Sequence, residues 1–153
     1  MNLRRLLACT ISEMIAGVSW IRPPTDGLRV LMYHAIGTPA LGDMLGLFSL
    51  SPECFRQHMS LLADWKQCRI VDFDSIALNS TGYRVAITFD DGYLDNLKVA
   101  APILCELGLP FTVFVTSEFV RSRKAEFLSP DALRELAALP GAKIGAHGTT
   151  MWP

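Results

Sequence analysis

Residues 85–89 form a nearly continuous apolar run that is followed at once by Asp90, Asp91 and Gly92. Such a run predicts a strand covered on both faces in a parallel sheet. The two carboxylates then lie at its C-terminal end, the edge at which parallel α/β sheets bind ligands. Because successive strand side chains point in opposite directions, one carboxylate can bind a cation while the other faces a substrate. The competing interpretation is an ordinary solvated turn, to which Asp-Asp-Gly is also suited.

The chain has 153 residues, of which 50% are apolar, and this fits one domain with a sizeable core. A formal net charge of −1 without a Lys/Arg stripe argues against nucleic acid as a partner. Cys9, Cys54, Cys68 and Cys105 show no CxxC pairing and no short even spacing, so we expect isolated, buried thiols. No apolar run is long enough to span a bilayer.

Residues 1–27 are predicted to form an N-terminal amphipathic helix and a linker. Apolar residues recur at helical spacing from Leu3 to Val18, and a Pro- and Gly-containing break follows them. A secretory signal is the alternative, because Arg4 and Arg5 precede an apolar stretch, but Glu13 cuts that stretch short. The isolated thiols and the lack of a clear signal peptide slightly favour a cytoplasmic location over export.

The rest of the chain alternates between strand and helix patterns, which predicts βα units around a parallel sheet. The predicted strands cover residues 28–34, 68–73, 84–89, 110–116 and 143–146. The predicted helices cover residues 52–65, 93–107 and 132–139, with a short helical turn at 74–78. Ser51-Pro52 and Ser129-Pro130 are helix starts, and Pro102 should kink or split its helix. Residues 35–50 are expected to form a long loop that could act as a lid.

Two histidines fall at the same predicted sheet edge as the Asp pair. His34 ends the first strand and His147 ends the last one. A lone histidine at a strand end is more often a structural residue than a functional one, and this is the favoured interpretation of His34.

Taken together, these segments resemble the polysaccharide deacetylases, which share the nodulation protein B homology domain of carbohydrate esterase family 4. The resemblance runs from about Leu28 to Met151. It is carried by Met32-Tyr33-His34, Ile87-Thr88-Phe89-Asp90-Asp91-Gly92-Tyr93, Asn96, Ala100, Pro102-Ile103-Leu104, Gly108-Leu109-Pro110, Phe114-Val115 and Ile144-Gly145-Ala146-His147.

The resemblance implies an α/β fold, a distorted (β/α) barrel, and metal-dependent removal of acetyl groups from a carbohydrate such as a chito-oligosaccharide. Asp90 matches the catalytic base, while Asp91 and His147 match metal ligands. The implied cofactor is a divalent metal, zinc first and cobalt second, and the implied partner is an acetylated carbohydrate. A bound metal polarises the acetyl carbonyl and acidifies a water, while a free carboxylate takes the proton.

The sequence departs from the family pattern in two places. Met151 stands where the second histidine of a His-x-x-x-His motif is expected, which should weaken metal binding. The later motifs do not appear before Pro153, so residues 28–153 are expected to be the N-terminal part of a deacetylase domain, a partial barrel without its C-terminal strands.

These departures predict an impaired deacetylase with open sheet edges. The alternative is a non-catalytic, truncated remnant or sugar-binding protein. A glycosidase is a weaker third hypothesis, because its two carboxylates usually come from different strands, whereas Asp90 and Asp91 are neighbours.

Overall fold

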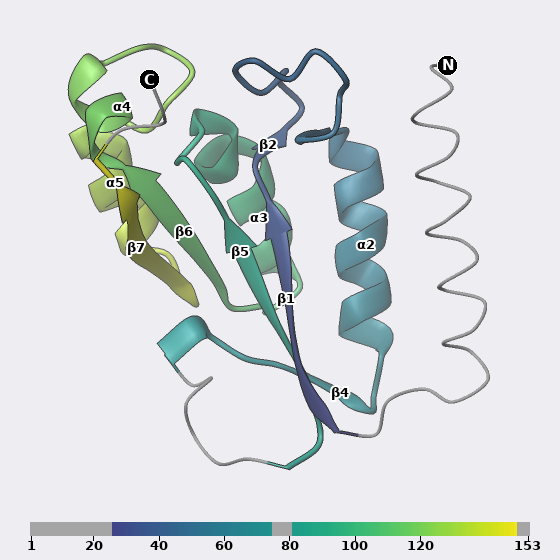
Figure 1. The fold of residues 1–153 in the computed structure, drawn as a ribbon. Helices are drawn as coiled ribbons and strands as arrows, with labels where there is room; N and C mark the ends of the chain where they lie inside the picture. The colour runs from purple at the N-terminus through teal and green to yellow at the C-terminus, as the bar shows by residue number, and fades with distance from the viewer. Residues whose placement is uncertain (1–25, 75–80, 150–153) are drawn as a thin grey trace.

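Five parallel strands form the main sheet of the protein (Figure 1). The structure is a computed structural model that describes residues 26–74 and 81–149. The strands are β1 (Gly27–Tyr33), β4 (Cys68–Ile70), β5 (Tyr83–Phe89), β6 (Phe111–Thr116) and β7 (Ala142–Gly148). Their order is β1-β5-β6-β7, with β4 beside the start of β5. The predicted α/β class and the parallel sheet are therefore confirmed.

Strand β5 is the centre of this sheet. It pairs with β1 along its whole length, and its last two residues, Thr88 and Phe89, pair with β6. Residues 85–89 are each no more than 2% exposed. The apolar run is thus buried as predicted, and the chain leaves the sheet at its C-terminal edge directly after Phe89.

The helices begin where the sequence indicates. In α2 (Pro52–Asp64) the Ser51 hydroxyl accepts from the Cys54 amide, and in α5 (Pro130–Ala137) Ser129 caps in the same way. The helix predicted over 93–107 is split into η2 (Asn96–Ala100), a π-helical turn, and α3 (Ala101–Glu106). Pro102 lies in the first turn of α3, directly after the π-helical turn, so the change in helical geometry falls where the sequence places the proline.

The main core lies between one face of the sheet and the helices. Phe89 and Phe111 from the sheet pack with Phe55 and Met59 of α2 and with Leu104 of α3. On the opposite face of β1, Val30 and Met32 remain 46% and 58% exposed. Among the described residues, β1 and β7 are each paired on one side only, so the sheet does not close into a barrel.

Three predictions need correction. The predicted loop 35–50 contains β2 (Ala35–Ile36) and β3 (Ser49–Leu50), which pair in parallel because the buried Ala35 and Ile36 anchor them. Helix α4 (Ser117–Ser122) was not predicted, since no side-chain cap, Gly or Pro separates it from β6. Cys54, Cys68 and Cys105 are free but partly exposed rather than buried.

Some predictions lie outside the described residues: the N-terminal helix, most of the turn at 74–78, Cys9 and Met151. Within the ranges 26–74 and 81–149, no helix is both long enough and apolar enough to cross a membrane.

Candidate functional site

The C-terminal edge of the sheet brings Asp90, Asp91 and His147 together. Asp90 directly follows β5, and its amide donates to the Tyr33 carbonyl at 2.9 Å, which continues the pairing with β1. His147 comes from β7, two strands away across β6. Residues 115 and 116 of β6 pair with Ala146 and Gly148, so His147 is an extra residue at a β-bulge. Bulges of this kind re-aim a side chain, here towards the carboxylates.

The imidazole of His147 faces both carboxylates. Its Nε2 lies 3.4 Å from Asp90 Oδ2, and its Nδ1 lies 3.7 Å from Asp91 Oδ1. The side chains differ in exposure, which is 38% for His147, 14% for Asp90 and 3% for Asp91. The inner carboxylate is therefore screened from bulk water, whereas the outer one can meet a substrate.

Asp91 is buried and has an unfavourable backbone conformation. Its φ of 71° lies in the left-handed region, and its carboxylate accepts from the Thr116 hydroxyl at 3.5 Å. Burial raises the pKa of Asp91, while His147, His34 and the Thr116 hydrogen bond act in the opposite direction. A buried carboxylate beside imidazoles is suited to a bound cation, which would compensate for the lost hydration.

Gly92 makes the turn after the Asp pair possible. Its φ is +75°, and a Cβ at this position would lie 2.8 Å from Val115 Cγ1 of β6. The Gly92 carbonyl accepts from the Leu128 amide at 2.9 Å. A side chain would therefore force apart the two strands that place Asp91 and Thr116.

We expect Asp91→Asn to raise the melting temperature of the metal-free protein by about 2–4 °C at pH 7. The pKa of Asp91 is raised, so its stabilising contribution is complete below its ordinary pKa of 3.8 and is lost as the pH rises through the raised value. At neutral pH the ionised group costs stability that a neutral amide recovers. Thermal melts in chelator test this, with the more exposed Asp90→Asn as the control that should change less. A lower melting temperature for Asp91→Asn would contradict it.

The Asp91 carboxylate and the His147 imidazole are atoms of the types that bind a divalent metal. Zinc binds imidazole nitrogen and carboxylate oxygen at about 2.0–2.2 Å, so two ligands of one tetrahedral ion lie about 3.3 Å apart. The separation of 3.7 Å between Asp91 Oδ1 and His147 Nδ1 is close to this value. Within residues 26–74 and 81–149, no group of three or more His, Cys, Asp or Glu side chains is placed to hold a metal ion. The pair fits as part of a metal site.

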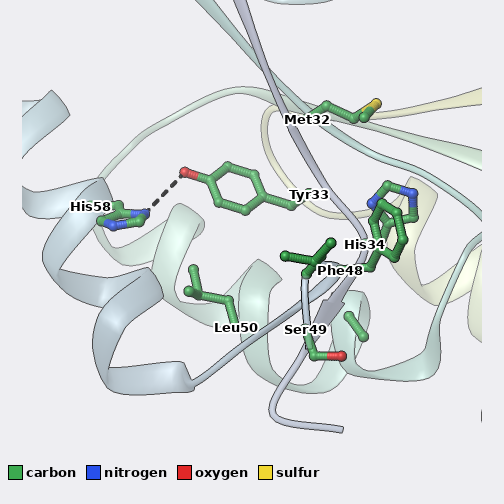
Figure 2. Close-up of a pocket in the computed structure, with 9 residues that line it drawn as sticks. Met32, Tyr33, His34, Phe48, Ser49, Leu50 and His58 are labelled. Atoms are coloured by element: carbon green, nitrogen blue, oxygen red, sulfur yellow. Dashed lines mark hydrogen bonds between the residues drawn. The ribbon is translucent and has the colours of Figure 1, made fainter. Parts of the chain in front are cut away.

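A pocket of about 290 Å³ opens beside this edge (Figure 2). His34 lies against Phe48, with ring centroids 4.9 Å apart, while Tyr33 extends in the opposite direction towards His58 (Figure 2). The His34 carbonyl accepts from the buried Asn96 amide at 2.8 Å. The pocket is lined by Met32, Tyr33, His34, Ala35, Leu47, Phe48, Ser49, Leu50 and His58.

The structure thus brings together all the predicted site residues, Asp90, Asp91 and His147, whose roles stay predictions. His34, for which a structural role was favoured, lies near enough for its charge to lower the pKa of Asp91. Thr116 was missed as a partner of Asp91. Its position at the end of β6 was the available signal, because parallel strands end at one edge.

The fold and this edge define an α/β protein with a parallel sheet and a carboxylate–imidazole centre at its C-terminal edge. Residues 78–152 match the family described as polysaccharide deacetylase. The chain is 27% identical over 135 residues to YxkH of Bacillus subtilis (strain 168), whose name assigns it to the same family, covering 84% of this chain and 45% of YxkH. The chain is therefore similar to polysaccharide deacetylases over most of its length.

Solved structures agree on the fold. The deacetylase PplD of Streptococcus pyogenes, solved in complex with acetate, aligns with a TM-score of 0.67 at 22% identity, covering 83% of this chain and 58% of PplD. IcaB from Ammonifex degensii aligns with a TM-score of 0.65 at 26% identity, covering 80% of this chain and 53% of IcaB. The chain therefore spans about half the length of these relatives.

Proposed function

We propose that this chain carries the catalytic edge of a metal-dependent carbohydrate deacetylase. The observation that carries the proposal is the placement of one imidazole, that of His147, between the Asp90 and Asp91 carboxylates at the ligand-binding edge of the sheet. The family relation supplies the reaction class, hydrolysis of an acetyl group on a carbohydrate.

The burial of the two carboxylates suggests a different role for each of them. Asp91 and His147 would hold the divalent cation, zinc or alternatively cobalt, since the buried carboxylate is the one that most needs a compensating charge. When bound, the metal would polarise the acetyl carbonyl and acidify a water. Asp90 is the freer carboxylate and would take the proton as the water attacks. The bond between the acetyl carbon and the sugar nitrogen would then break, with the proton passing from Asp90 to the leaving amine and acetate as the other product.

Metal binding should be weaker than in a complete three-residue shell. Asp91 and His147 are the described ligands, and Met151 stands at the sequence position of a further ligand. A thioether is a soft, neutral donor that suits zinc poorly beside a carboxylate. We therefore propose reduced turnover that responds to added metal.

The test is acetate release from N-acetylated chito-oligosaccharides by the full chain, with added zinc or cobalt and with chelator. We expect release that depends on metal and falls by about 10²–10⁴-fold in Asp90→Asn, because a general base contributes a factor of this size. Asp131→Asn is the matched control, since it makes the same change at an exposed carboxylate of α5 outside the site and should leave release unchanged. No release above the blank, or release that persists in Asp90→Asn, would contradict the proposal.

A further inference from the structure

A second cluster of reactive side chains lies between helix α2 and the end of β1. The Sγ atom of Cys54 is 3.6 Å from His58 Nε2, one helical turn further along. On its other side, His58 Nδ1 is 3.4 Å from the hydroxyl of Tyr33, which comes from β1 (Figure 2). The thiol, the imidazole and the phenol therefore form a chain of contacts at the rim of the pocket.

The phenol in this chain keeps its proton. Burial raises the pKa of Tyr33 to about 12, with a smaller contribution in the same direction from the neighbouring Cys54. The neutral hydroxyl oxygen can accept from Nδ1–H of His58. With the imidazole proton on Nδ1, the other nitrogen, Nε2, is the acceptor that faces the thiol.

The helix adds to this arrangement. Cys54 lies in the first turn of α2, and its amide donates to the Ser51 cap at 3.2 Å. The positive end of the helix dipole favours a negative charge in that turn. A thiol beside an imidazole in a helical first turn has two features that increase thiolate reactivity.

We propose that Cys54 is the reactive thiol of this protein and that His58 is its base, making a covalent modification site for small, soft electrophiles. In the reaction with iodoacetamide, the thiol proton passes to His58 Nε2 and the Sγ–carbon bond forms. The carbon–iodine bond breaks and iodide leaves with its electron pair. The product is a thioether on Cys54.

The other described cysteines provide internal controls, because Cys54, Cys68 and Cys105 are all partly exposed. Burial raises the pKa of the Cys68 thiol, which reduces its thiolate fraction. The Cys105 thiol donates to the Pro140 carbonyl, which cannot take up its proton. Differences in reaction rate among the three thiols then report their chemistry more than their access to reagent.

The experiment is iodoacetamide labelling of the folded chain at pH 7, with the rate at each cysteine followed by peptide mass spectrometry. We expect Cys54 to react about tenfold faster than Cys68 and Cys105. His58→Gln should slow Cys54 about fivefold or more and leave the other two rates unchanged. Those unchanged rates also confirm that the variant is folded. Equal rates at the three thiols of the unaltered protein, or an undiminished Cys54 rate in His58→Gln, would overturn the proposal.

Discussion

Replacing His147 with alanine is expected to weaken cobalt binding by about 100-fold or more, since loss of an outer-shell partner alone already costs 10–100-fold. The physical reason is that only two protein ligands are proposed among the described residues. Asp91 Oδ1 and His147 Nδ1 lie 3.7 Å apart, and these two side chains are the ligands that we propose for the ion. Removing the imidazole leaves a single buried carboxylate, which cannot fix a transition metal by itself. Cobalt absorption in a titration of the full chain measures the affinity directly.

Two variants control this result. Asp90→Asn should change cobalt affinity only a few-fold, because Asp90 is assigned to the proton and not to the metal. Asp131→Asn removes an exposed carboxylate of α5 outside the site and should leave the affinity unchanged. If His147→Ala binds cobalt as tightly as the unaltered chain, the assignment of His147 as a metal ligand is wrong.

Gly92→Ala is expected to lower the free energy of unfolding by about 2–4 kcal/mol. Two costs combine here. An alanine would have to adopt a φ of +75°, and its Cβ would lie 2.8 Å from Val115 Cγ1 and 3.3 Å from Val115 Cβ. Val115 Cβ is attached to the backbone and cannot rotate away, so β6 must shift at the edge that holds Asp91 and Thr116.

Gly108→Ala is the matched control for this substitution. Gly108 has a similar φ of +65°, but nothing lies within 4 Å of a Cβ built there. It should therefore cost only the backbone term, about 1–2 kcal/mol. Urea unfolding of both variants separates the two contributions, and an equal loss in the two would show that the Val115 contact is unimportant.

The sheet and its edge could be predicted from the sequence because the signals are local. The apolar run at 85–89 indicated a buried parallel strand, and Ser51-Pro52 and Ser129-Pro130 marked the two helix starts. Strand ends at one edge then placed Asp90, Asp91 and His147 near one another. Local propensity and burial pattern agree in these segments, which is why the predicted parallel sheet was confirmed, while the roles of the three residues stay predictions.

The features that could not be predicted depend on distant partners. The bulge that turns His147 towards the carboxylates arises from a register shift against β6. No residue of β7 indicates this shift in the sequence. The left-handed backbone of Asp91 is held by contacts with Thr116, 25 positions later. The pairing of β2 with β3 likewise joins segments separated by the loop between them.

Anomalous X-ray diffraction at the zinc edge, from crystals of this chain grown with zinc, tests the proposed metal ligands most directly. We expect a peak bonded to a carboxylate oxygen of Asp91 and a nitrogen of His147, both at about 2.0–2.2 Å, with Asp90 alongside and not coordinated. A peak bonded instead to Cys54 and His58, or no peak at the sheet edge under saturating zinc, would contradict the metal-dependent deacetylase site.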